Sequence, residues 1–202
     1  MSKENLLIVV AGPSGVGKGT IAKKLFAQVK SIEYSVSATT RECRKGEKDG
    51  VNYFFVSADK FNKMIEKNEF LEYADVFGNK YGTPKKYVFD KLESGKDVLL
   101  EIDVQGAVMV MDSCPEAVFI FILPPDIKEL KKRLVGRGTE TKEQLELRLS
   151  MAKDEIKYAE KFDYIVVNKS VETAAEEVKS ILISEKCKRE RNQAIIESLI
   201  KS

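Results

Sequence analysis

The chain has 202 residues, of which 43% are hydrophobic and 33% charged, as is typical of one globular domain with a sizeable core. Its 34 Lys and Arg residues nearly balance 32 Asp and Glu residues, so the formal net charge of +2 does not indicate a nucleic-acid binder. The sequence contains no histidine. Ser-His-Asp triads, histidine general bases and histidine metal sites are therefore excluded, and catalysis has to rely on carboxylates, Lys, Arg, backbone N–H groups and added metal.

The composition also bears on where the protein works. No apolar run approaches the ~20 residues of a membrane span, and residues 1–5 lack the apolar segment and cleavage site of a signal peptide. The three cysteines, Cys43, Cys114 and Cys187, are widely spaced and fit neither a disulfide framework nor a metal site. We therefore expect a cytoplasmic protein.

The chain begins with the pattern of a phosphate-binding loop. Residues 6–10 form an apolar run that predicts a buried strand, and residues 21–26 have helical spacing. A phosphate-binding loop requires a strand before it and a helix after it. Its glycines let the backbone N–H groups surround an anion at the N-terminus of that helix. The predicted nucleotide-binding loop consists of Gly12, Pro13, Ser14, Gly15, Val16, Gly17, Lys18, Gly19 and Thr20.

One position departs from the common pattern G-x-x-x-x-G-K-[ST]. Gly19 stands where a hydroxyl is expected, and Thr20 follows one place later. In the common pattern this hydroxyl binds magnesium, so the departure affects the prediction of the magnesium ligand more than the prediction that the loop holds phosphate. The alternative is a chance glycine-rich turn, but Gly12, Gly17 and Lys18 all match, and we expect Lys18 to reach the outer phosphates.

The next part of the chain predicts a small β-rich lobe over residues 35–83. Strands are indicated by three segments, residues 34–38, 51–56 and 70–77. Residues 39–50 are charged and contain glycine, which indicates a mobile loop, and residues 78–84 read as a turn. Ser57 and Asp59 suit the start of a helix between the second and third strands.

After the lobe, apolar strands alternate with helices. A helix ends near residues 94–95, and further helices are expected from Asp126, Thr141 and Val171, with a break at residues 136–139. The expected strands are residues 98–102, 118–123 and 164–167. Continuous apolar strands separated by helices indicate a parallel sheet covered on both faces. The C-terminal segment 187–202 is basic and then apolar, which predicts a docked or frayed helix or, alternatively, a subunit contact.

Two arginines and two tyrosines are candidates for a monophosphate clamp. Arg41 and Arg44 lie three apart in the mobile loop, and Tyr53 and Tyr81 lie beyond it. Arginine forks match phosphate oxygens, and tyrosine hydroxyls add neutral donors. The alternatives are surface arginines that aid solubility and tyrosines that pack in the lobe.

Glu72 and Ser37 are candidates for recognition of a base. A carboxylate in the otherwise apolar strand around Glu72 can accept two parallel N–H bonds, and guanine offers that pair in its N1–H and 2-amino groups, whereas adenine does not. Ser37 stands near a strand end, where its hydroxyl can bond the base oxygen. An outward-facing strand residue is the alternative for Glu72.

These motifs together resemble the guanylate kinase family, over roughly residues 7–186. The matching segments, in chain order, are residues 12–20, 35–47 with Tyr53, 68–72, 81–83, 101–106 and 137–140. The resemblance implies a three-layer α/β P-loop kinase fold, with a parallel sheet core, a small β-rich GMP-binding lobe and a helical lid. It implies one domain over residues 1–202, with its core in residues 1–34, 84–125 and 161–202, its lobe in residues 35–83 and its lid in residues 126–160.

The resemblance also implies roles for individual residues. GMP would be held by Ser37, Arg41, Arg44, Tyr53, Glu72, Tyr81, Thr83 and Glu101. ATP would be held by the loop at residues 12–20, with Arg137 near the adenine and Asn168 at its rim. The catalytic cations would be Lys18, Arg41, Arg133, Arg137 and Arg148. Thr20 and Asp103 would hold Mg²⁺, directly or through water.

The implied reaction is transfer of the γ-phosphoryl group of MgATP to GMP, and to dGMP, giving ADP and GDP. The acceptor is an ionised phosphate oxygen, so no general base is needed and the absence of histidine is no obstacle. Two rivals remain open, a catalytically inactive guanylate kinase-like module that binds phosphorylated protein segments and a related kinase acting on a sugar phosphate. We expect small-molecule substrates, no nucleic acid and no membrane partner, and either a monomer or a homo-oligomer.

Overall fold

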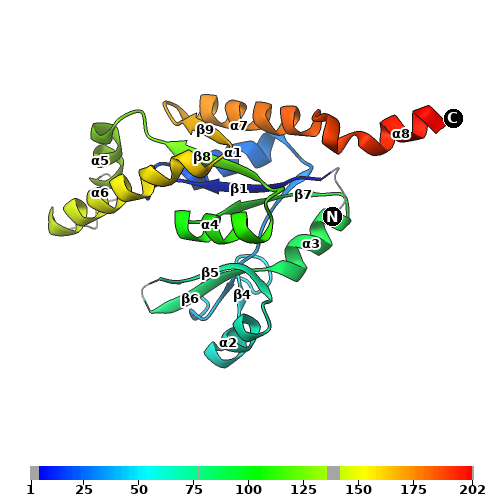
Figure 1. Cartoon of the computed structure of the whole chain (residues 1–202). Coiled ribbons are helices and arrows are strands. Elements are labelled where there is room, and N and C mark those ends of the chain that lie inside the picture. The colour runs from blue at the N-terminus through cyan, green and yellow to red at the C-terminus, as the bar shows by residue number, and fades with distance from the viewer. Residues whose placement is uncertain (1–4, 77, 136–141, 202) are drawn as a thin grey trace.

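The computed structural model describes residues 5–76, 78–135 and 142–201 (Figure 1). Its central layer is a five-stranded parallel sheet in the order β2-β7-β1-β8-β9. These strands are β1 (Leu7–Ala11), β2 (Ile32–Tyr34), β7 (Asp97–Glu101), β8 (Val118–Leu123) and β9 (Tyr164–Val167). The expected α/β class is thereby confirmed.

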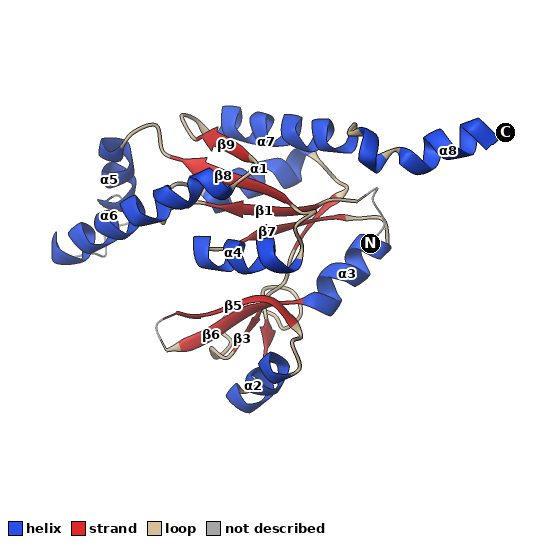
Figure 2. Ribbon diagram, in the orientation of Figure 1, coloured by secondary structure: helices blue, strands red, loops and turns tan. Residues whose placement is uncertain are grey.

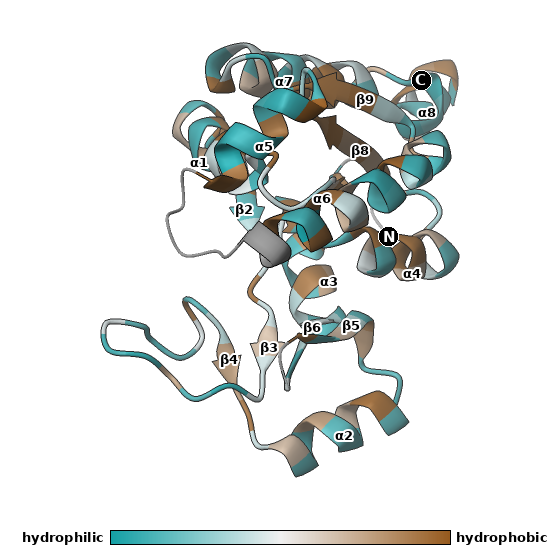
Figure 3. Cartoon of the chain, turned by 90° about the vertical axis from the view of Figure 1, so that its left-hand side faces the viewer, coloured by the Kyte–Doolittle hydropathy of each residue, from teal (hydrophilic) through white to brown (hydrophobic). Residues whose placement is uncertain are grey.

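Helices cover both faces of this sheet. One face, which includes Ile8 and Ile120, packs against α1 (Lys18–Gln28) and α7 (Val171–Lys186). The other face, which includes Val9, packs against α3 (Lys85–Glu93) and α4 (Val104–Ser113). Figure 3 shows the strands β8 and β9 in the brown of hydrophobic residues, next to helices with teal, hydrophilic segments. Because side chains alternate along a strand, burial on both faces requires the continuous apolar runs seen in the sequence.

A second, four-stranded sheet forms the lobe, in the order β4-β3-β6-β5. Its strands are β3 (Ala38–Thr39), β4 (Phe54–Phe55), β5 (Phe70–Val76) and β6 (Asn79–Pro84). Helix α2 (Ala58–Glu66) closes it, and Phe61 of this helix stacks on Phe70 with ring centroids 4.5 Å apart. Ser57 caps α2 by accepting a hydrogen bond from the Lys60 N–H, as expected. The two sheets are separate layers of the molecule (Figure 2).

The structure corrects three predicted assignments in the lobe, two strands and one turn. The strand expected over residues 34–38 is two strands in different sheets, because Tyr34 pairs with Leu99 in the core whereas Ala38 pairs with Gly82 in the lobe. The strand expected over residues 51–56 is limited to Phe54–Phe55. The turn expected over residues 78–84 is largely β6, since pairing with β3 on one side and β5 on the other outweighs its turn-forming residues.

Two further helices lie beside the phosphate-binding loop. Helix α5 (Ile127–Val135) is capped by Asp126, whose Oδ1 accepts a hydrogen bond of 2.7 Å from the Glu129 N–H, and α6 (Lys142–Ile156) leads into a 3₁₀ turn, η1 (Lys157–Lys161). Leu130, Leu134 and Ala152 form the small core that joins these helices. The break expected at residues 136–139 lies outside the described residues.

The C-terminal segment forms a short 3₁₀ turn, η2 (Arg189–Arg191), and helix α8 (Gln193–Lys201). This last helix extends away from the body of the molecule (Figure 1), and none of its residues is buried. Within the described part of the chain, no helix is both long and apolar enough to cross a membrane.

Candidate active site

The phosphate-binding loop connects β1 to α1 in the conformation that its glycines permit. Gly12 has φ +143° and Gly17, which caps α1, has φ +102°, values that residues with a Cβ rarely adopt. A Cβ at Gly12 would also lie 2.4 Å from the Ile122 carbonyl oxygen. The Lys18 Nζ donates to the Gly12 carbonyl at 2.6 Å, so the lysine folds over its own loop.

Two side chains hold this loop at the Val16 carbonyl. Asn168, which follows β9 and is buried, donates from its Nδ2 to this oxygen at 2.7 Å, and Arg133 of α5 donates to it from Nη1 at 3.2 Å. Arg133 also donates to the Asn168 carbonyl at 3.0 Å and from Nε to Glu129 at 3.0 Å. We expected Arg133 as a lid cation and Asn168 at the adenine rim, and the structure places both directly against the phosphate loop.

Helix α6 reaches the same loop through a residue that the sequence patterns did not single out. Glu155 accepts a hydrogen bond from the Ser14 backbone, and burial raises the pKa of its carboxyl although Lys18 lies close enough to oppose the shift. Arg148 lies half-buried on the same helix. Arg137, the third expected lid cation, lies outside the described residues.

Glu101 stands between the phosphate loop and the lobe. A Cβ at Gly19 would lie 3.3 Å from both of its carboxylate oxygens, so the glycine that replaces the usual hydroxyl leaves room for this acid. Glu101 also accepts a hydrogen bond of 3.1 Å from the Tyr34 hydroxyl. Thr20, the next residue, is exposed on the first turn of α1. The residue expected only in the GMP site therefore borders both sites.

The oxygens available here fit a magnesium ion that is held mainly by its substrate. Asp103 ends β7 and caps α4, where its Oδ1 accepts a hydrogen bond of 2.7 Å from the Gly106 N–H. Among the residues that the structure describes, no three His, Cys, Asp or Glu side chains gather into a metal cage. Mg²⁺ usually keeps several waters and takes one or two carboxylates plus substrate phosphates. Thr20, Glu101 and Asp103 are compatible with that manner of binding.

A pocket of about 170 Å³ lies at the junction of the core and the lobe. It brings together six of the residues expected to bind nucleotide or metal: Ser37, Tyr53, Glu72, Tyr81, Glu101 and Asp103. Its lining also includes residues that sequence reasoning missed, namely Tyr34, Ser35, Asn52, Ala74, Val76 and Ile102. Nothing in their spacing distinguishes them, because the pocket forms only when two separate sheets meet.

Glu72 is the buried acid of this pocket, with 6% of its surface exposed. The Thr83 hydroxyl donates to one carboxylate oxygen at 2.6 Å, and a Cβ at Gly106 would lie 3.0 Å from the other. Burial raises the pKa of Glu72 to about 7, while the bond from Thr83 opposes the shift. A carboxylate that is buried with unused acceptor capacity is suited to receive two N–H donors from a ligand.

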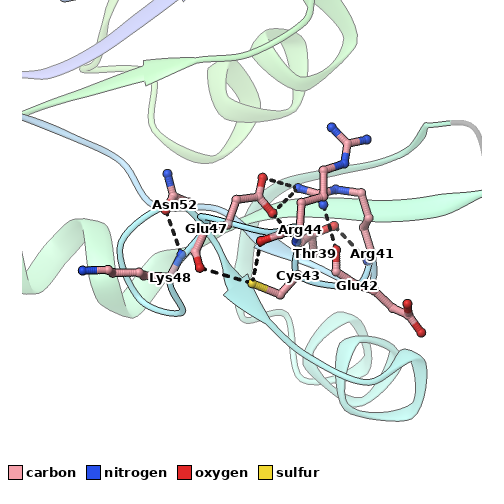
Figure 4. A network of polar contacts seen from close by, with 8 residues as sticks. All are labelled: Thr39, Arg41, Glu42, Cys43, Arg44, Glu47, Lys48 and Asn52. Carbon is pink, nitrogen blue, oxygen red and sulfur yellow. Dashed lines mark hydrogen bonds and ion pairs between the residues drawn. The ribbon is translucent and has the colours of Figure 1, made fainter.

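The charged loop beside the pocket is organised by Glu47 (Figure 4). Its two carboxylate oxygens accept hydrogen bonds of 2.8 and 3.0 Å from the Arg41 Nη2, and one of them also accepts a bond of 2.9 Å from the Arg44 backbone N–H. The pair raises the pKa of Arg41 and lowers that of Glu47. Cys43 is exposed in this loop, and its thiol lies 3.5 Å from the Glu47 carbonyl oxygen.

Aromatic rings complete the surroundings of Arg41. Its guanidinium lies 5.4 Å from the centroid of Tyr53 and 5.8 Å from that of Phe55, and the Tyr53 and Tyr81 rings meet edge to face at 5.9 Å. Arg44 is exposed. The structure thus brings Arg41, Tyr53 and Tyr81 together as the sequence predicts, with Arg44 beside them in the loop.

Comparisons with known proteins agree with this arrangement. The family model described as guanylate kinase matches residues 4–185. The guanylate kinase of Clostridioides difficile is 56% identical over 194 residues, with 96% of this chain and 95% of that protein covered. The guanylate kinase of Halalkalibacterium halodurans is 55% identical over 192 residues, with coverages of 95% and 94%.

A solved structure shows the same likeness. The crystal structure of guanylate kinase from Anaplasma phagocytophilum matches with a TM-score of 0.73 and 37% sequence identity, covering 94% of this chain and 90% of that one. Both the family model and the relatives span nearly the whole sequence. The chain, with its phosphate loop, its buried acid and its arginine loop, belongs to the guanylate kinase family.

Proposed function

We propose that this protein transfers the γ-phosphoryl group of ATP to GMP, and also to dGMP, giving ADP and GDP. The observation that carries the proposal is the pocket at the junction of core and lobe, where the buried Glu72 shares the lining with Tyr53 and Tyr81 of the lobe and with Glu101, which lies against Gly19 of the phosphate-binding loop. A module that only binds phosphopeptides is disfavoured, because the phosphate loop retains Gly12, Gly17 and Lys18. A reducing cytoplasm suits its three unpaired cysteines.

The base of GMP is recognised by Glu72, Thr83 and Ser37 in this proposal. An ionised Glu72 accepts hydrogen bonds from the guanine N1–H and 2-amino groups, and Thr83 orients the carboxylate through the bond of 2.6 Å. Adenine presents an acceptor at N1, which would face the carboxylate and repel it. A site whose own polar groups would be left unpaired rejects the wrong base strongly.

The phosphate of GMP is held by Arg41, Arg44, Tyr53 and Tyr81. Glu47 keeps the Arg41 guanidinium and the Arg44 backbone in place before the substrate arrives. The Arg41 Nη1 meanwhile donates to the Glu42 carbonyl at 2.7 Å. When GMP binds, the Arg41 Nη1 would donate to a phosphate oxygen in place of this carbonyl. The charged acceptor makes that hydrogen bond stronger than the one to the neutral carbonyl.

ATP is held by the loop at residues 12–20, with Lys18 turning from the Gly12 carbonyl to the outer phosphates. By the family resemblance, Arg137 and Asn168 would contact the adenine, and Arg133, Arg137 and Arg148 would supply positive charge from the lid. Thr20 and Asp103 would hold Mg²⁺, directly or through water, and the ion would neutralise charge on the phosphate oxygens. Glu101, which lines the pocket and lies against Gly19, would orient water around it.

The protein contributes positioning and charge stabilisation, which phosphoryl transfer needs more than covalent chemistry. The attacking phosphate oxygen of GMP is already ionised at neutral pH, so the lack of histidine has no cost. Closure of the lobe at residues 35–83 and the lid at residues 126–160 excludes water, which would otherwise accept the phosphoryl group.

The test is ADP release from ATP across a panel of GMP, dGMP, AMP, CMP, UMP and ribose 5-phosphate. We expect turnover with GMP and dGMP and little with the others. The variant Lys18→Ala is the control, because it should abolish transfer while circular dichroism shows an intact fold. Equal rates with AMP and GMP would contradict the assignment of Glu72, and turnover only with ribose 5-phosphate would support the sugar-phosphate kinase.

A further inference from the structure

Tyr34 contacts the acid that lies against the phosphate-binding loop. It ends β2, an edge strand of the central sheet, and its ring meets Phe26 of α1 edge to face with centroids 5.8 Å apart. The Tyr34 hydroxyl donates a hydrogen bond of 3.1 Å to the Oε2 of Glu101, which ends β7. The tyrosine is therefore supported by the helix that follows the loop, and it holds one oxygen of the acid.

Gly19 bounds the same carboxylate from the first turn of α1. A Cβ at this position would lie 3.3 Å from both carboxylate oxygens of Glu101, closer than neighbouring side chains usually pack. The backbone does not itself require glycine here, because Gly19, unlike Gly12 and Gly17, does not have a positive φ. Glycine also weakens a helix relative to alanine. The small residue therefore serves to leave room for Glu101.

The group that Tyr34 presents to Glu101 is a neutral hydroxyl. A phenol donates one hydrogen bond and leaves the charge of the carboxylate in place, whereas a lysine or arginine would neutralise it. One bond to Oε2 also uses only part of the carboxylate, which has about four acceptor positions. Tyr34 thus limits the orientations of Glu101, while its charge and most of its acceptor capacity remain for other partners.

Both oxygens of Glu101 lie against the position where the common loop pattern carries a magnesium-binding hydroxyl. We propose that Tyr34 and Gly19 are positioning residues, which hold Glu101 where it orders the water shell of the magnesium ion of MgATP. A carboxylate suits this task, because Mg²⁺ keeps several of its waters and binds proteins through one or two acids. The inference rests on the proposed function, in which MgATP occupies the loop.

The inference predicts an effect on magnesium-dependent binding alone. Tyr34→Phe removes the hydroxyl and retains the ring that packs on Phe26. We expect the Kd of ADP to rise about 3- to 10-fold in the presence of Mg²⁺ and to stay the same in EDTA, while the Kd of GMP is unchanged. The effect is smaller than for a fully buried bond to a charged group, because Tyr34 is partly exposed.

Gly19→Ala tests the other side of the carboxylate. The added methyl group should displace Glu101 and weaken the binding of ADP in the presence of Mg²⁺. The melting temperature should not fall, since alanine favours the helix more than glycine does. A loss of binding without a loss of stability would separate the positioning role from a general effect on the fold.

Isothermal calorimetry on the full chain measures these Kd values for the wild type, Tyr34→Phe and Gly19→Ala, each also in a Glu101→Ala background. A residue that acts through Glu101 should have no further effect once this acid is removed, which the double-mutant cycle detects. Tyr73→Phe is the matched control, because this tyrosine of β5 is 41% exposed and Tyr34 is 45% exposed. Thermal melting establishes that each variant is folded.

The outcomes separate the inference from the proposed function. Weaker binding of ADP with Mg²⁺ alone, which disappears in the Glu101→Ala background, supports the proposal. It is overturned if Tyr34→Phe has no effect, weakens ADP equally with and without Mg²⁺, or weakens GMP instead. A loss with Gly19→Ala that persists without Glu101 overturns the role of Gly19. A wild-type protein that binds neither nucleotide, or binds ADP no better with Mg²⁺, would contradict the proposed function itself.

Discussion

At the scale of single residues, Glu72 shows a conflict between binding and stability. Burial raises the pKa of this carboxyl from 4.5 to about 7, so the ionised form that the proposed guanine contact requires is the form that the folded protein disfavours. One pKa unit corresponds to about 1.4 kcal/mol, and the difference therefore amounts to about 3 kcal/mol when the group is ionised. Residues that serve a ligand commonly carry such a cost.

The sign of this effect gives a first prediction. Because the folded-state pKa is raised, the cost is absent below about pH 4.5, grows as pH rises and is complete above about pH 7. Glu72→Gln removes the charge while its amide oxygen can still accept the bond from Thr83. We expect the variant to be more stable than the wild type by about 1–3 kcal/mol at pH 8 and equally stable near pH 4.5.

Urea unfolding at the two pH values measures this difference, and calorimetry should show that the variant no longer binds GMP. The prediction is wrong if Glu72→Gln is the less stable protein at pH 8. That result would mean that the carboxylate stabilises the unliganded fold.

Glu47 gives a second prediction at the same scale. It holds the Arg41 guanidinium and the Arg44 N–H with three hydrogen bonds, which keeps both arginines in place before GMP binds. Glu47→Gln removes the charge but retains the length of the side chain. We expect the KM for GMP to rise about tenfold, because charge-assisted bonds are roughly twice as strong as neutral ones.

Steady-state kinetics with each substrate varied in turn measures this change, and the KM for ATP should stay the same. Glu42→Gln is the matched control, since Glu42 is an exposed acid of the same loop. A fall in kcat with an unchanged KM for GMP would show that Glu47 does not preorganise the phosphate site.

At the scale of elements, the phosphate loop depends on helices and strands that are distant in the chain. The Val16 carbonyl accepts hydrogen bonds from Arg133 of α5 and from Asn168 after β9. The two donors are themselves joined, because Arg133 also donates to the Asn168 carbonyl. The loop is therefore supported by a network, and the loss of one member should affect the other.

Arg133→Met tests whether this arginine supports the loop or acts only on the transferring phosphoryl group. Methionine keeps much of the apolar stem and removes every donor. If Arg133 supports the loop, the KM for ATP should rise about 5- to 20-fold, as expected for the loss of one or two buried bonds. Calorimetry of ATP binding by the variant and by Asn168→Ala measures the effect on each side of the network.

A purely catalytic role gives a different result. In that case kcat would fall while the affinity for ATP stayed unchanged, because only the transition state would lose a contact. The double variant adds a further check, since members of one network should not contribute independently.

At the scale of the whole molecule, the helix α8 lies apart from both nucleotide sites (Figure 1). None of its residues is buried, so it contributes little to the hydrophobic core. Deletion of residues 193–202 should leave the melting temperature within about 3 °C of the full chain, as expected for a loss under 1 kcal/mol. The KM values for GMP and ATP should also be unchanged.

Differential scanning calorimetry and light scattering check this prediction together. Light scattering matters because the alternative for this segment is a subunit contact. A deletion that lowers the melting temperature by much more, and changes the molecular mass in solution, would favour that alternative over an unattached helix.

Much of the fold follows from local patterns that the sequence contains. The strands β1 and β8 are buried on both faces, so their apolar runs predict them well, and Ser57, Asp126 and Ser170 mark the starts of helices. The strand β6 was missed because its residues are typical of turns, and it forms only through pairing with β3 and β5. Residue propensity describes the conformation that a segment favours in isolation. Strand pairing depends on the neighbouring segments, and here it outweighs that propensity.

The sequence by itself determined the family and the phosphate-loop pattern, because the glycines, Lys18 and the apolar runs around them lie close together in the chain. It offered Glu72 and the arginines only as candidates for a second site. Only the tertiary structure decided which groups meet there. Arg133 and Asn168 reach Val16 across 117 and 152 positions of chain, and Ser35 joins Glu72 only where two sheets meet. Periodicity relates residues a few places apart, so contacts between distant segments are decided by packing of the whole chain.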